Sequence, residues 1–136
     1  MLAVLGAIAF TIMTLLIKST VSAIPPEKLL FYVFLLGTIL LFAKLIGTGQ
    51  NLTIGLSDLA VLTAIALCSV LGNVLLFTSY KVGPNPGYVD AVASTKIVLI
   101  VILSAVLLGS KLNVKGLLGA LLVLAGVILL LISQPT

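Results

Sequence analysis

Lys96 is the residue whose position most needs a chemical explanation. It lies about nine residues into an apolar stretch, which at about 1.5 Å per helical residue is roughly 13 Å and close to the middle of a bilayer. A lysine there costs about 2.5 to 3.5 kcal/mol on insertion scales, so such residues usually face a cavity, a partner or a pathway. We predict that Lys96 holds an anionic group of a ligand or exchanges a proton within the membrane. The alternative is a lysine that snorkels to the interface.

Four further polar side chains are predicted to bind substrate with Lys96. Asn73 carries an amide in the middle of an apolar stretch, where it must find hydrogen-bond partners in the protein or in a ligand. Ser94 and Thr14 are weaker candidates, because hydroxyls in membrane helices often bond to preceding carbonyls. Tyr32 lies near the end of a segment, where an interfacial aromatic belt explains it equally well.

Asp90 precedes Lys96 by six residues in the same segment. Six residues correspond to about 240° around a helix, so the two side chains are not neighbours on one face. We predict instead that Asp90 caps the helix near Gly87, where an acid complements the dipole of the amino-terminal end.

Several chemistries are excluded by composition. The chain has no His, one Cys and only three acids, each near the end of an apolar segment, so we predict no catalytic residues, no metal site and no cofactor. A P-loop lysine motif for ATP is also missing. The net charge of +4 comes from seven lysines scattered singly with no Arg, which suits membrane-flanking positions rather than nucleic acid.

The elements that must position these residues are membrane-spanning helices. Hydrophobic residues make up 62% of the 136 positions and charged residues 7%, against roughly 25% charged in soluble domains. The apolar runs are about 20 residues long and do not alternate in polarity, which predicts helices rather than barrel strands. We predict an all-α integral membrane protein, a single transmembrane domain over 1–136 with five helices at about 2–23, 28–46, 59–80, 88–108 and 114–132.

Three stretches resemble the drug/metabolite transporter superfamily, specifically one EamA-type repeat of five helices. They are residues 24–32 (IPPEKLLFY), residues 79–84 (SYKVGP), and residues 107–112 (LLGSKL) followed by Gly116, Gly119, Leu124, Ala125, Gly126 and Val127. With the stretches in this order and at these spacings, the resemblance covers nearly the whole chain. The resemblance implies movement of small metabolites across a membrane.

The chain departs from the family pattern at two positions. The family often has an acidic residue where Ser110 stands, and a proline in the fourth helix near Ile97. Without that proline we expect the fourth helix to be straighter than in relatives. Without the acid, no role can be carried over to Ser110.

A single repeat has consequences for assembly, because many family members carry two repeats in opposite orientation with the substrate between them. The five-helix prediction places three lysines on the Met1 side (Lys44, Lys111, Lys115) and three on the other side (Lys18, Lys28, Lys81). The positive-inside rule therefore hardly specifies an orientation. We predict dual topology and an antiparallel homodimer, or pairing with an oppositely oriented paralogue; the alternative is one fixed orientation.

These observations predict a half-size secondary transporter of the cell membrane, which moves an anionic or zwitterionic small metabolite by alternating access. Its expected partners are membrane lipids, a second copy and the small-molecule substrate. Two other interpretations remain: a subunit of a lipid-linked sugar flippase, and a non-transporting membrane or assembly subunit. The last predicted helix also carries five small residues: Gly116, Gly119, Ala120, Ala125 and Gly126. They form either a subunit contact or a contact within one bundle.

Overall fold

The regular structure of the chain is helical. The computed structural model describes residues 1–111 and 113–133, and no strand occurs among them. The helices are α1 (Leu2–Thr20), α2 (Pro26–Gly47), α3 (Leu56–Val82), α4 (Pro86–Ala93), α5 (Lys96–Leu108) and α6 (Val114–Ile132). Five segments are long and apolar enough to cross a membrane. Helices α4 and α5 together form the fourth of them, Pro86–Leu108. The predicted all-α membrane fold with five spans is confirmed.

Local sequence explains where these helices begin and end. Pro26 begins α2, a position where the missing N–H of proline costs nothing. The side chains of Asn85 and Asn113 cap α4 and α6 by accepting hydrogen bonds from the backbone N–H groups of Gly87, at 2.8 Å, and Lys115, at 3.1 Å. Asp90 lies inside α4 and is not its cap, so that prediction was wrong: the asparagine just before the helix occupies the capping position.

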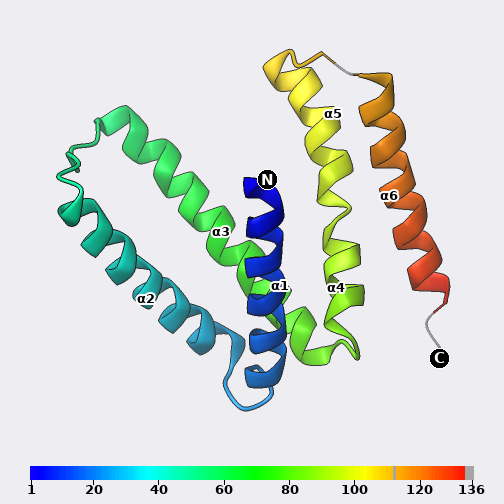
Figure 1. Ribbon diagram of the computed structural model, residues 1–136, viewed down its shortest axis with the longest axis horizontal. Helices are drawn as coiled ribbons and strands as arrows, with labels where there is room; N and C mark the ends of the chain where they lie inside the picture. Colours follow the sequence, from blue (N-terminus) through cyan, green and yellow to red (C-terminus); the bar gives the residue numbers. More distant parts are fainter. Residues whose placement is uncertain (112, 134–136) are drawn as a thin grey trace. The chain divides into compact units, whose positions relative to one another are not determined.

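The fourth span is interrupted at Ser94 and Thr95, which separate α4 from α5 (Figure 1). The N–H groups of Thr95, Ile97 and Val98 donate to carbonyls three residues earlier, at 3.1, 2.9 and 3.1 Å. This spacing is that of a 3₁₀ turn rather than an α-helix. A break in the α-helix therefore forms here without a proline.

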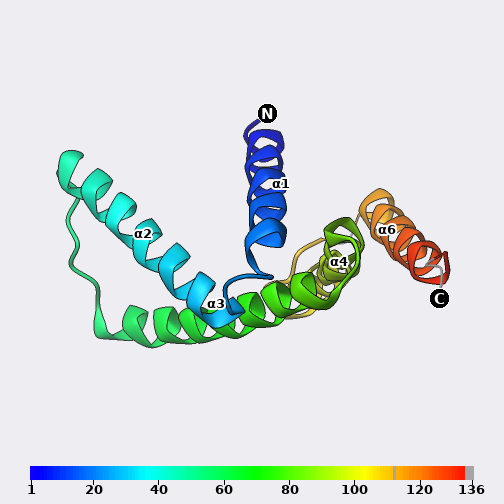
Figure 2. The ribbon, with the colours of Figure 1, turned by 90° about the horizontal axis from the view of Figure 1, so that it is seen from below.

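The chain forms two compact units, and the first, Met1–Val82, contains α1, α2 and α3. Helices α1 and α2 each pack against α3. Helix α2 lies closest to α3 near its own beginning and diverges from it toward the loop at residues 48–55 (Figure 2). Buried apolar side chains of this unit gather where α1 and the start of α2 meet the end of α3, and they include Ile17, Val21, Leu30, Phe77 and Tyr80.

The second unit, Gly83–Thr136, contains α4, α5 and α6. Both α4 and α5 pack along α6, which runs back beside them (Figure 1). Ala120 and Val127 are the buried residues of α6. They lie seven residues apart, so they share one face of the helix, and this face is the one that contacts α4 and α5.

Most large apolar side chains of the spans point outward. Leu40 of α2 is 72% exposed and Leu122 of α6 is 73% exposed. In water such surfaces would be unfavourable, but lipid tails are as apolar as leucine and no hydrophobic drive buries these side chains. The exposure pattern is therefore that of helices whose solvent is the bilayer.

Candidate functional site

Lys96 is the first residue of α5 and follows the break in the fourth span directly. It stands ten residues after Pro86, where this span begins, which is roughly 15 Å along a helix and half of the hydrocarbon thickness. Its side chain is exposed, and within residues 1–111 and 113–133 its ammonium makes no hydrogen bond or ion pair. A lysine at mid-membrane depth is thus left available to a ligand or a partner.

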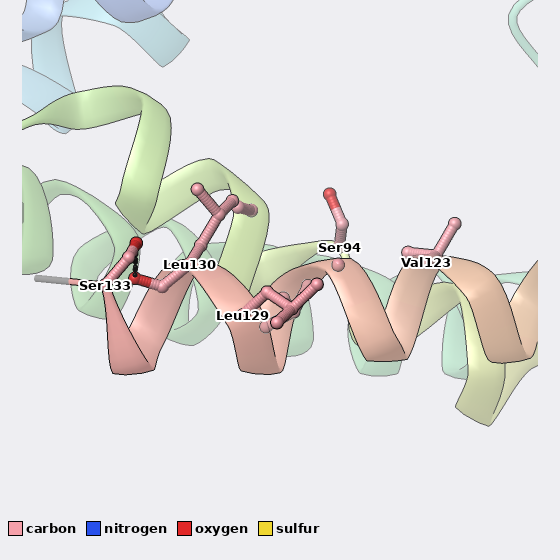
Figure 3. A pocket seen from close by; sticks show the side chains of 8 residues that line it. Ser94, Val123, Leu129, Leu130 and Ser133 are labelled. Atoms are coloured by element: carbon pink, nitrogen blue, oxygen red, sulfur yellow. Dashed lines mark hydrogen bonds between the residues drawn. The ribbon is translucent and has the colours of Figure 1, made fainter.

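Ser94 precedes Lys96 by two residues and lines a groove between α4 and α6 (Figure 3). The groove has a volume of about 640 Å³, and its other walls include Val123, Leu129 and Leu130 of α6. The Ser94 hydroxyl donates to the carbonyl oxygen of Asp90 at 2.8 Å, and the Ser133 hydroxyl at the end of α6 donates to that of Leu130 at 3.0 Å. Both hydroxyl protons are used within their own helices, so this groove offers an apolar surface with two acceptor oxygens.

Asn73 also bonds within its own helix. Its amide nitrogen donates to the carbonyl oxygen of Ser69 at 2.8 Å and lies 3.5 Å from the Ser69 hydroxyl. The side chain is half-buried in α3. In the part of the chain that the structure describes, its amide oxygen has no hydrogen bond. Asn73 can therefore still accept a hydrogen bond from a ligand or a partner helix.

Thr14 belongs to a buried polar contact between α1 and α3. Its hydroxyl oxygen lies 3.4 Å from the phenol oxygen of Tyr80, and the two residues are only 7% and 1% exposed. One turn further along α1, the Lys18 ammonium donates to the main-chain carbonyl oxygen of Tyr80 at 2.8 Å. Three groups of the first unit are thus joined at the end of α3.

Lys18 and Tyr80 were not grouped with Thr14 from the sequence: Lys18 was counted as a charge flanking the membrane, and Tyr80 was only part of the stretch at residues 79–84. One signal could have revealed Lys18, since it follows Thr14 by four residues and so lies on the same face of α1. Its donation to Tyr80 also has a local reason. That carbonyl is in the last turn of α3, where carbonyls lack helical partners and a positive charge complements the helix dipole.

Tyr32 lies in the second turn of α2 and is 49% exposed. Its ring meets Phe31 edge to face, with centroids 5.4 Å apart and planes at 74°. This is the arrangement that aromatic pairs prefer. An exposed tyrosine near the beginning of a span fits an interfacial position.

The predicted site residues fall into two sets, one in each compact unit. Thr14, Tyr32 and Asn73 belong to Met1–Val82, while Ser94 and Lys96 belong to Gly83–Thr136. Within the described ranges 1–111 and 113–133, no three His, Cys, Asp or Glu side chains gather where they could hold a metal ion. Near the middle of the spans, the described residues offer the Lys96 ammonium, the Asn73 amide and several hydroxyls, a set that can bind a polar solute.

Comparison with known proteins identifies the family. No curated protein and no solved structure matched the chain. The model of the EamA-like transporter family matches residues 1–132, which include all five membrane-spanning segments. This match agrees with the resemblance found in residues 24–32, 79–84 and 107–127. The chain therefore belongs to the EamA-like transporter family.

Proposed function

We propose that the protein is a half-size secondary transporter that moves a small anionic or zwitterionic metabolite across the cell membrane. The family membership makes it a membrane transporter of the drug/metabolite type. The observation that carries the substrate class is Lys96, a cation at mid-membrane depth beside a break in its helix. Because a charge is costly at that depth, its presence is best explained by an anionic group that it binds.

The break at Ser94 and Thr95 supports the same role. Discontinuous helices at the middle of a membrane are typical of transporter binding sites, where irregular backbone lines a cavity. Stretches of 3₁₀ structure within a helix also mark hinges. In the proposed cycle, α5 carries Lys96 and its bound substrate while α4 and α5 change their angle at this point.

Alternating access requires a second repeat in opposite orientation, which a second copy of the chain would supply. With successive spans crossing the membrane in alternating directions, Lys18, Lys28 and Lys81 would lie at span ends on one side and Lys44 and Lys115 at span ends on the other, and Lys111, in the turn before α6, would join the second group. This balance of three against three supports insertion in both directions. We therefore place the substrate in a site that an antiparallel homodimer completes.

Helix α6 carries the surface that we assign to dimer contact. Gly116 and Gly119 are exposed and lie about 60° apart around the helix, and a Cβ added to either would meet nothing within 4 Å in the protomer. Small residues without internal contacts let a second helix approach closely. Replacing Gly119 with Leu would block that approach, and the Cβ of the new side chain would meet nothing within 4 Å in the protomer.

Transport by reconstituted protein tests the proposal. Proteoliposomes containing the wild type are assayed for uptake of a panel of labelled small carboxylates, phosphate esters and amino acids. We expect Lys96→Met to abolish uptake of whichever solute is carried, and Lys96→Arg, which keeps the charge, to retain part of it. The matched control is the double variant Lys28→Met with Lys44→Met, which removes one lysine from each side and preserves the balance of charge.

Three results would contradict the proposed function or favour another interpretation. If Lys96→Met transports as well as the wild type, the anion-binding role is wrong. If no solute in the panel is carried, the non-transporting subunit becomes the better interpretation. Uptake or flipping of a lipid-linked sugar instead of soluble solutes would favour the flippase subunit.

A further inference from the structure

A second groove lies within the first unit, between α2 and α3. Its α2 wall consists of one helical face with spacings of three and four residues: Glu27, Leu30, Phe31, Phe34, Leu35 and Thr38. Val70 and Val74 of α3 form the opposite wall, and the volume is about 410 Å³. Apart from the carboxylate at one end and the Thr38 hydroxyl at the other, the lining is hydrocarbon.

The length of this groove matches one leaflet of a bilayer. Eleven residues separate Glu27 from Thr38, which is roughly 16 Å along a helix, and half of the hydrocarbon core is about 15 Å. Glu27 is the second residue of the span Pro26–Gly47 and so lies at the level of the headgroups. The groove therefore runs from the headgroup layer to the membrane middle.

The groove opens toward the bilayer. Phe31 is 61% exposed, and Leu35 and Val70 are each 43% exposed. Leu30, by contrast, is only 3% exposed and forms the floor. An occupant can therefore enter sideways from the lipid phase, with one apolar chain lying on Leu30 between the two helices.

The negative charge of Glu27, at the headgroup end of the groove, determines which lipid headgroup fits. Among residues 1–111 and 113–133, Glu27 has no ion pair, and its carboxylate is exposed at the mouth of the groove. Lys28 lies about 100° away around the helix and does not line the groove. The ring of Phe31, one turn after Glu27, adds a face to which an ammonium group is attracted.

We propose that this groove binds one bilayer phospholipid with an amine headgroup, of the ethanolamine class. The ammonium pairs with Glu27, and one acyl chain lies along Phe31, Phe34 and Leu35 as far as Thr38. The position of Glu27 in the first turn of α2 also stabilises the helix dipole without any ligand. Stabilisation of the helix dipole would not, however, require an apolar groove below the carboxylate, nor a groove whose length matches one leaflet.

Native mass spectrometry of the full chain tests this site. Protein purified in detergent is offered equal amounts of phosphatidylethanolamine and phosphatidylglycerol with identical acyl chains. We expect about a fivefold preference for the ethanolamine lipid, the factor that corresponds to an ion pair worth about 1 kcal/mol. Glu27→Gln should abolish the preference, and Glu27→Asp, which keeps the charge, should retain it.

Two further variants separate the groove from the charge alone. Asp58→Asn removes another first-turn acid, at the beginning of α3 and outside the groove, and should leave the preference unchanged. Leu35→Trp fills the groove from its exposed side and should reduce retention of the ethanolamine lipid. Circular dichroism of each variant checks that the helices are intact.

Two results would overturn the proposal. One is equal retention of the two lipids by the wild type, or an unchanged preference in Glu27→Gln. The other is a disulfide between copies in native membranes when Val70→Cys is introduced into a Cys68→Ser chain, because a second copy would then cover the groove. Neither result depends on transport, so the proposed function stands or fails separately.

Discussion

The hydroxyl oxygens of Thr14 and Tyr80 lie 3.4 Å apart between α1 and α3, although 66 residues separate them in the chain. Both side chains are buried, and the ring of Tyr80 also packs against Phe77, with centroids 6.4 Å apart. The separation is longer than the usual 2.5 to 3.0 Å for hydroxyl pairs. We therefore ascribe the packing of α1 on α3 more to the buried ring than to this hydrogen bond.

A double-mutant cycle tests whether the buried ring of Tyr80 contributes more to stability than its hydrogen bond with Thr14. Thr14→Val and Tyr80→Phe should each lower the free energy of unfolding by about 0.5 kcal/mol, with a coupling near the average of about 0.6 kcal/mol for hydrogen bonds between membrane helices. Tyr80→Ala should cost about 3 kcal/mol or more, because it leaves a cavity. Reversible unfolding in mixed micelles provides the measurement. A coupling above about 2 kcal/mol would contradict the ranking.

Lys18 should contribute more to stability than other lysines near the membrane surface. Lys18→Met removes a charged donor from the Tyr80 carbonyl at 2.8 Å, and we expect a loss of about 1 to 3 kcal/mol in the same unfolding assay. Lys28→Met, an exposed lysine of α2, is the control and should change stability by less than about 0.5 kcal/mol. Equal effects would show that the contact with Tyr80 is not stabilising.

Gly109 ends α5 in the left-handed conformation, with φ of 62°. Side chains are unfavourable there, so Gly109→Ala should destabilise the protein by about 1 to 2 kcal/mol. Gly37→Ala in α2 is the matched control, since a Cβ there meets nothing within 4 Å and φ is not positive. The control should be neutral or stabilising by up to about 1 kcal/mol. A Gly109→Ala variant as stable as the control would contradict this account of the helix end.

The break in the fourth span should be visible in hydrogen exchange. Amides of Thr95, Ile97 and Val98, whose bonds span three residues, should exchange about tenfold faster than those of residues 123–127 in continuous α6. The measurement is amide exchange of the protein in nanodiscs. Equal protection of the two segments would mean that the break does not weaken the span.

The five spans could be predicted because apolar length alone determines them, and prolines, glycines and asparagines mark their ends. The break at Ser94 could not, since no proline or glycine lies between Ala91 and Lys96. Its physical signal is weaker: the Ser94 hydroxyl bonds to the Asp90 carbonyl, and serines that do so often bend helices.

The candidate site was only partly predictable for a different reason. Thr14 could be selected as a polar residue in lipid, but its contact with Tyr80 depends on how α1 crosses α3, which apolar periodicity does not specify. Lys18 was counted only as a charge that sets orientation. The depth of Lys96, by contrast, follows from counting residues, and the structure places it at the start of α5 near the middle of the span.

The orientation of the chain in native membranes tests the central claim, transport by an antiparallel pair, most directly. Cys68 is exposed and is first replaced by Ser. Single cysteines are then introduced at Ser22, in the turn after α1, and at Gln50, in the loop after α2. The account predicts that a membrane-impermeant maleimide labels each position from both sides, about half of the copies from each. Labelling of Ser22→Cys from one side only and Gln50→Cys from the other only would contradict it.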